Sequence, residues 1–358
     1  MVEQDGAPVP RRVWIAAAVV LALAVAAGGY IWWRHDDRTS FAWAVDHAPQ
    51  GAQRLSWTDW AAIRAHEHAG LSARSSVPDL NRFLDRAYDH DLSSTSALVT
   101  SAAVLQQKFG FSPADAEWEL FSQSYQGSVV MVRLPSAGAV RDVADRLDGL
   151  GFTRPDEADG VWSGGADLLA RISPSLSGQL QYVALDADDS LVLASDSAAY
   201  LATAMDAVRG HAAAVQGLGA VVDDAGEPLS AAVYDGDYAC GALAMAHAGP
   251  SDEAQGKELV ARAGEVNPYS AFAMSDEPDG SVRVAFAFDD DSVARANADS
   301  RAILARGPAP GQGGTFGERF RVASATAHGS LVVLRLEPRP DASVLSDLST
   351  GPLLFATC

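Results

Sequence analysis

A chain of 358 residues, of which 48% are apolar and 20% charged, has the composition of a folded protein with a sizeable core, and this excludes a disordered chain. Its 46 acidic and 26 basic residues give a formal net charge of -20 at pH 7. Such a charge repels phosphate backbones, so we expect no nucleic acid among the partners.

The first predicted element is an uncharged stretch from Val13 to Trp33, "VWIAAAVVLALAVAAGGYIWW". As an α-helix it is long enough to span the hydrocarbon core of a bilayer, about 30 Å. Aromatic residues near its ends are placed like interfacial anchors: Trp14, Tyr30, Trp32 and Trp33. A cleaved secretory signal is the alternative, but its apolar region is normally about 7–15 residues long, so the stretch favours an uncleaved transmembrane helix.

This helix predicts a single-pass protein of the cell membrane whose main domain is extracytoplasmic. Arg11 and Arg12 precede the helix, and positive charge favours the cytoplasmic side, although Arg34 and Arg38 follow it. The orientation therefore depends partly on the cysteines considered below. The start of the chain divides into a cytoplasmic tail (1–12), the transmembrane helix (13–33) and a juxtamembrane linker (34–52).

The first half of the domain, residues 53–225, is expected to start with a short strand and a mainly helical insertion at about 58–122. The Thr-Asp pair after the strand can cap a helix, because both side chains accept hydrogen bonds from free first-turn amides. Further on, "FSPADAEWELF" places Ser112 before Pro113, which predicts the start of another helix.

The rest of the first half predicts an α+β unit with antiparallel strands, in the order strand, helix, strand, strand, helix. The segment "GSVVMVRL" alternates as a strand does, and "SAGAVRDVADRLDGLG" has the periodicity of a helix. The segment "LQYVALDADDSLVLAS" predicts a hairpin around an Asp-rich turn.

The same order returns in the second half, residues 226–358. There "GSVRVAFAF" matches "GSVVMVRL", "GSLVVL" matches "DSLVLA", and "VYDGDYACGALAMA" matches "SWTDWAAIRA". Matches in the same order indicate a duplicated unit whose loops differ in length. The pattern leaves open whether the halves form one sheet or two.

The chain contains only two cysteines, Cys240 and the last residue, Cys358. In an exported domain this predicts a single disulfide that pins the C-terminus to the second half. Closing so long a loop contributes about 4–5 kcal/mol in the chain-entropy model. The alternative is a buried thiol at 240 and an exposed thiol at 358, since sequence does not provide the distance that a bond requires.

No sequence pattern predicts a catalytic, cofactor-binding or metal-binding residue. His66 and His68 are two apart, whereas the zinc-protease pattern needs histidines four apart on a helix, and His90 between Asp89 and Asp91 favours a solvated helix surface. The chain has no G-x-S-x-G motif, and "GPAPGQGGTFG" lacks the lysine of a phosphate loop.

Other polar and aromatic groups are interpreted structurally. The stretches "LDADDS" and "FDDDS" fall at a turn and a helix start, where aspartates cap free amides. Glu117 and Glu119 flank a tryptophan, but a glycosidase pair is defined by its separation in space. The four tryptophans of the domain favour a core over a ligand groove: Trp57, Trp60, Trp118 and Trp162.

The leading hypothesis is a non-catalytic binding or interaction module of a bacterial cell envelope, held at the membrane by its N-terminal helix. Its partner would be an envelope protein or a small ligand in a cleft between the two halves. The alternative is an envelope hydrolase whose site is assembled only by folding. A pocket that gathers two carboxylates would favour the hydrolase.

Overall fold

The computed structural model describes residues 38–157 and 160–358, in which eleven strands form one antiparallel sheet. The strands are β1 (Arg54–Thr58), β2 (Trp118–Ser124), β3 (Gly127–Arg133), β4 (Val161–Ser163), β5 (Tyr182–Asp186), β6 (Leu191–Ser195), β7 (Ser230–Asp235), β8 (Ala271–Asp276), β9 (Val282–Ala287), β10 (Phe320–His328) and β11 (Leu331–Pro338). Their order across the sheet is β10-β11-β9-β8-β7-β1-β2-β3-β6-β5-β4. The fold is therefore α+β with a large antiparallel sheet.

The two halves meet at the centre of this sheet. Strands β1 and β7 pair antiparallel, with Ser56 opposite Ala232. Outward from β1 the order is β2, β3, β6, β5, and outward from β7 it is β8, β9, β11, β10. The halves thus follow the same strand order in one continuous sheet, and β4 is added at the edge of the first half.

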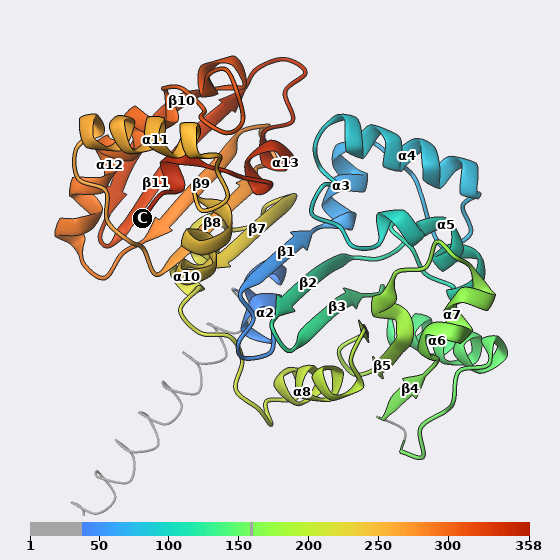
Figure 1. The fold of residues 1–358 in the computed structure, drawn as a ribbon. Coiled ribbons are helices and arrows are strands. Elements are labelled where there is room, and N and C mark those ends of the chain that lie inside the picture. Colours follow the sequence, from blue (N-terminus) through green and yellow to red (C-terminus); the bar gives the residue numbers. More distant parts are fainter. Residues whose placement is uncertain (1–37, 158–159) are drawn as a thin grey trace, which may run out of the picture.

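Helices cover both faces of the sheet (Figure 1). They are α2 (Ser40–Asp46), α3 (Trp60–His66), α4 (Val77–Asp89), α5 (Ala102–Val104), α6 (Ala137–Leu150), α7 (Gly165–Ile172), α8 (Ala198–Val208), α9 (Gly219–Ala225), α10 (Gly236–Tyr238), α11 (Pro250–Ala263), α12 (Asp291–Ala305) and α13 (Val344–Ser349). Short 3₁₀ and π segments join them: η1 (Val99–Ser101), η2 (Leu105–Phe109), η3 (Gly178–Gln181), η4 (Ala239–Leu243), η5 (Phe316–Glu318) and η6 (Leu354–Ala356).

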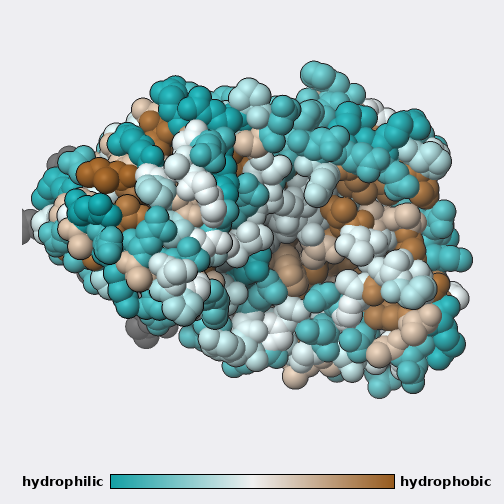
Figure 2. Space-filling model, turned by 45° about the horizontal axis from the view of Figure 1, so that its top comes forward, coloured by the Kyte–Doolittle hydropathy of each residue, from teal (hydrophilic) through white to brown (hydrophobic). Residues whose placement is uncertain are grey.

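The two faces of the sheet are packed differently. One apolar cluster runs across both halves on the face covered by α2, α8 and α9, and it includes Leu55, Trp57 and Val233. On the other face there are two separate clusters. One lies under α3 to α7 and the other under α10 to α13. Figure 2, in which the top of Figure 1 comes forward, shows a hollow near the middle of the surface.

A polar strip separates these two clusters. The side chains of Arg54, Ser56 and Thr58 alternate with the apolar ones of β1, so they point to the face with two clusters. The Thr58 hydroxyl lies 2.9 Å from that of Thr95, and both residues are buried. Because these polar residues do not join the apolar clusters, the helices on this face form two groups, α3 to α7 and α10 to α13.

Strands β2, β4 and β8 were not predicted from the sequence, and the helix predicted from Ser112 is wrong. Residues 113–115 form a turn, and the chain enters β2 at Trp118. Trp118 and Leu120 join the cluster shared by both halves, while Glu119 points to the other face and is buried. A buried charged residue inside an apolar strand disguised its pattern.

The predicted juxtamembrane linker is also partly folded. Helix α2 is capped by the Thr39 hydroxyl, which accepts a hydrogen bond from the amide of Ala42 at 3.1 Å. Phe41 is 1% exposed, and its ring centroid lies 5.3 Å from that of Trp57. The chain therefore belongs to the packed domain from α2 onward, earlier than position 53.

The predicted disulfide between Cys240 and Cys358 is present, with the two Cα atoms 5.8 Å apart. The segment before it is held by other contacts as well. The Tyr269 hydroxyl donates to the Ala356 carbonyl at 2.7 Å, and Arg301 donates to the Phe355 carbonyl at 2.7 Å. The C-terminus is therefore fastened to the second half both covalently and by buried hydrogen bonds.

The predicted transmembrane helix, with the anchors Trp14, Tyr30, Trp32 and Trp33, lies outside the described residues. Within residues 38–157 and 160–358, none of the helices has the length and apolar character needed to cross a membrane.

Candidate functional site

A pocket of about 280 Å³ lies between the two halves, on the face with the divided clusters. The first half contributes the ends of α3 and α4, with His66 and Asp89. The second half contributes the turn between β8 and β9, the end of β11 and the start of α13. The base of the pocket includes apolar side chains: Leu92, Leu229, Val282 and Val344.

Asp276 is the last residue of β8 and is only 8% exposed. Its Oδ2 atom accepts a hydrogen bond from the Ser230 hydroxyl at 2.9 Å. Burial raises the pKa of Asp276 well above its usual range, and the negative charge of Asp91 raises it further, while the Ser230 hydrogen bond opposes the rise. This carboxyl group therefore holds its proton more strongly than an exposed aspartate does.

Asp91 connects the two halves. It follows α4 in the left-handed region, with φ of 62°, and is 7% exposed. Its Oδ2 atom accepts a hydrogen bond from the amide of Ser346 at 3.1 Å, in the first turn of α13. The α13 N-cap residue, Ser343, makes no side-chain capping bond, so Asp91 from the other half takes that role.

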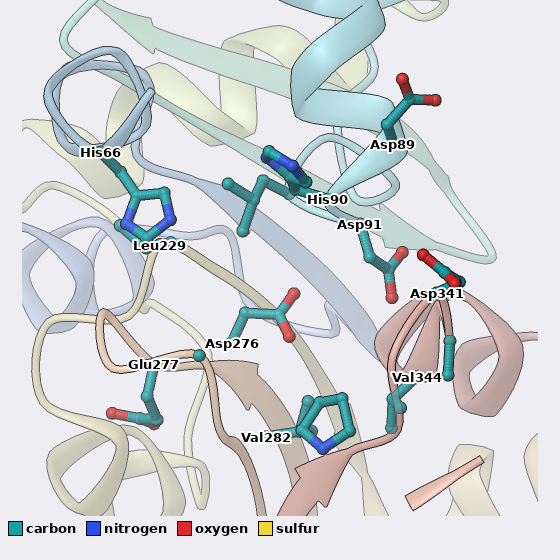
Figure 3. Close-up of a pocket in the computed structure, with 14 residues that line it drawn as sticks. His66, Asp89, His90, Asp91, Leu229, Asp276, Glu277, Val282, Asp341 and Val344 are labelled. Atoms are coloured by element: carbon teal, nitrogen blue, oxygen red, sulfur yellow. The ribbon is translucent and has the colours of Figure 1, made fainter. Parts of the chain in front are cut away.

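The electrostatic setting of Asp91 is mixed. Burial raises its pKa, and hydrogen bonds from the Ser346 and Leu345 positions oppose the rise. The free amides of a helix N-terminus also favour a negative charge. Figure 3 shows the carboxyl groups of Asp91 and Asp276 projecting toward the same open space, with Asp341 beside Asp91.

His90 is held at the rim by a residue outside the pocket. Its Nδ1 atom lies 2.6 Å from Oε1 of Glu67, and Nε of Arg86 lies 3.4 Å from Oε2 of the same carboxylate. The Glu67 side chain is 5% exposed. This contact fixes the His90 ring, and the same carboxylate offsets the charge of Arg86.

The pocket as a whole is strongly acidic. Five carboxylate residues and two histidines line it: Asp89, Asp91, Asp276, Glu277, Asp341, His66 and His90. Neither lysine nor arginine is among its lining residues. The Glu277 carboxylate is paired with Arg283, whose Nε lies 3.1 Å from its Oε1 atom, so this one charge is offset. An acidic pocket with an apolar base attracts organic cations. Its two buried carboxyl groups could also exchange a proton with a bound molecule.

Several of these residues stand out in the sequence, but nothing there indicates that they meet in space. His66, Asp89, His90 and Asp91 were interpreted as solvated helix surface, whereas the structure brings them to the pocket wall. Asp276 and Asp341 were missed. The one available signal was an aspartate at the end of an apolar strand, in "AFAMSDEPDGS". No group of three or more His, Cys, Asp or Glu in residues 38–157 and 160–358 is arranged to hold a metal ion.

The other groups considered in the sequence have structural roles. Asp186 accepts hydrogen bonds from two amides of its turn, and Asp290 caps α12. The tryptophans are buried as predicted: Trp57, Trp60, Trp118 and Trp162. Glu117 and Glu119 do not line the pocket.

Glu119 in β2 is fully buried, with no exposed surface. Its Oε2 atom accepts hydrogen bonds from Trp60 Nε1 at 2.8 Å and from the Ser96 hydroxyl at 2.7 Å, and its Oε1 atom accepts one from the Ala97 amide at 2.6 Å. Burial raises the pKa of Glu119 to about 7, although these hydrogen bonds oppose the rise. Glu119 thus ties the helical insertion to the sheet.

Comparisons with known proteins do not identify a family for this chain. No family model and no curated protein matches the chain. The solved structure of crystal form I of TP0453 is similar at a TM-score of 0.41 and 7% sequence identity, covering 87% of this chain and 97% of that one. A likeness this distant carries no argument about function.

Proposed function

We propose that this protein is a single-pass, membrane-anchored module outside the cytoplasm of a bacterial cell, and that it binds a small organic cation between its two halves. The uncharged run at 13–33 with its terminal aromatic residues supports the anchor. The disulfide between Cys240 and Cys358 supports an oxidising compartment. The matching strand orders, together with the sequence matches, support a duplicated unit.

The observation that carries the proposal is the acidic pocket. Coulombic attraction strengthens away from bulk water, and here Asp91 and Asp276 are both less than one tenth exposed. The apolar base, with Leu92 and Val344, suits the methylene groups of an alkyl amine, whose ammonium group would face the carboxylates. A volume of about 280 Å³ matches a ligand of this size.

The test is calorimetric titration of the full-length chain in detergent with the diamine putrescine, with neutral butanediol as the matched probe. We expect the diamine alone to bind, and added salt to weaken binding because it screens the charges. Asp276→Asn should weaken binding about tenfold or more, because a bound ammonium group favours the ionised form of Asp276, and the charge-assisted hydrogen bond between them contributes about 1.5–3 kcal/mol. Asp299→Asn removes the same charge at an exposed site of α12 and should leave binding unchanged. Equal loss in both variants would contradict a specific site.

A second function, hydrolysis of an envelope polymer, is favoured by the two carboxyl groups in one pocket. Asp276, whose pKa is raised well above its usual range, would donate a proton, and Asp91, held at a helix N-terminus, would act as the negative partner. In this case purified wild-type protein should release soluble fragments from isolated cell-wall material, and Asp276→Asn should abolish release. Diamine binding without any fragment release would favour the binding module.

A further inference from the structure

The two edges of the sheet are built differently. At the first-half edge, β4 has three residues, and Thr153 bridges Ser163 on its outer side. At the second-half edge, β10 has nine residues, and no segment within 38–157 or 160–358 pairs with its outer side. A long strand with an unpaired edge offers main-chain hydrogen bonds to another strand.

The register shows which groups are free. The amide of Phe288 donates to the Ser330 carbonyl at 2.9 Å, so alternate β11 residues from Val332 onward bond to β9. The residues between them bond to β10, where Val333 lies opposite Thr326 and Leu331 opposite His328. In β10 the intervening residues, Ala325 and Ala327, therefore direct both amide and carbonyl away from β11.

This edge lacks the usual protection against strand pairing. The segment from Val322 to Ala327, "VASATA", contains no charge and no proline, and its one irregularity is the shift in register between Val322 and Ser324. The β10–β11 hairpin carries Arg321, Arg335 and Glu337, so its formal charge is 2 - 1 = +1, whereas the whole chain has -20. Two copies of this acidic chain would meet with little repulsion here.

We propose that β10 pairs antiparallel with β10 of a second copy of this chain, around a two-fold axis at Thr326. In this register Thr326 faces Thr326, Ala325 faces Ala327, and Ser324 faces His328. Cross-strand threonine pairs are favourable, and no like charges are opposed. Each Ala325–Ala327 pair forms two main-chain hydrogen bonds. The pairing joins the sheets of both copies through an isologous contact.

The test is oxidative cross-linking of the full-length chain in detergent through an engineered thiol. Both native cysteines are in the disulfide, so Thr326→Cys introduces a single free thiol. A closely opposed pair at the axis has Cα atoms about 4.5 Å apart, within the range of a disulfide. We expect a product with the mass of two chains. Ser163→Cys, an exposed thiol on the opposite edge, is the matched control and should give about tenfold less product.

Ala325→Pro in the Thr326→Cys chain provides the second comparison. Proline removes an amide that faces away from β11, so the β10–β11 ladder stays intact while pairing with a second copy is blocked. We expect the cross-linked product to fall about tenfold, with the melting temperature near that of the parent chain. Equal products from Thr326→Cys and Ser163→Cys would overturn the proposal. So would undiminished cross-linking in a folded Ala325→Pro chain, or a product that contains another protein in place of a second copy.

Discussion

Glu119 is expected to make the stability of the domain depend on pH, and Glu119→Gln should remove the contribution of this residue to that dependence. The pKa of this buried carboxyl group is raised to about 7 from an unfolded value of about 4.5. Between these values the folded chain holds a proton that the unfolded chain has released. The free energy of unfolding therefore falls as pH rises from about 4.5 to about 7, and changes little above that.

The expected magnitude follows from the size of the shift. About 2.5 pKa units at 1.36 kcal/mol each correspond to about 3 kcal/mol of stability lost across this window. Glutamine cannot titrate, so the difference between wild-type and Glu119→Gln should move by about this amount in favour of the variant as pH rises. The variant also loses an acceptor for Trp60 Nε1 or Ser96. This loss lowers the free energy of unfolding of the variant by the same amount at every pH, so the difference in pH dependence between the two proteins is unchanged.

The assay is urea unfolding of the full-length chain in detergent at several pH values from about 4.5 to about 8. Glu265→Gln, at an exposed position, serves as the matched control and should follow the wild-type curve. If wild-type and Glu119→Gln lose stability in parallel over the whole range, the buried carboxyl group does not hold a proton near neutral pH, and the reasoning is refuted.

Three further predictions concern the C-terminal segment and the contact between the halves. Cys240→Ala should lower the free energy of unfolding by about 4–5 kcal/mol, because a loop with a sequence separation of 118 is no longer closed; reduction of the wild-type chain should reproduce the loss in the same urea assay. Arg301→Met should lower the free energy of unfolding by about 3 kcal/mol, because it leaves buried carbonyls such as that of Phe355 unpaired, and the loosened segment before Cys358 should show faster hydrogen exchange. Asp91→Ala should lower the free energy of unfolding by about 1–2 kcal/mol, because α13 loses its cap. Asp89→Ala, at an exposed position, is the control and should unfold thermally close to wild-type.

Local patterns were sufficient to predict much of the fold. The patterns in "GSVVMVRL" and "GSVRVAFAF" identified β3 and β9. Each of these strands has a neighbouring strand on both sides and packs against helices, so its sequence is rich in apolar residues. The hairpins β5–β6 and β10–β11 followed from two apolar runs around a turn. The disulfide followed from the number of cysteines. These features depend on neighbouring residues or on simple counting.

Features that depend on distant residues could not be predicted in this way. The pairing of β1 with β7, which joins the halves into one sheet, depends on register between segments about half a chain apart, and nothing in either segment specifies it. Strand β2 was missed because Glu119 breaks its apolar pattern. The buried environment that accepts this carboxyl group comes from Trp60 and Ser96 in other elements.

The pocket is the clearest case of such long-range assembly. Asp91 and Asp276 come from different halves, and each is an ordinary polar residue at the end of an element in the sequence. Burial of two carboxyl groups near one another disfavours their ionised forms, a cost that side chains without a titratable group would avoid. Groups with shifted pKa values that are gathered in one cavity are typical of functional sites.

The arrangement of the sheet explains why this cavity lies between the halves. On the face with α2, α8 and α9 the apolar layer is continuous, so apolar packing holds the halves together there. On the opposite face the polar side chains of β1 divide the core, and α3 and α4 end at the pocket where α13 begins. Asp91 crosses it by capping α13. A ligand that neutralises Asp91 would weaken this cap while adding contacts to both halves, so occupancy of the pocket and the seating of α13 are expected to be coupled.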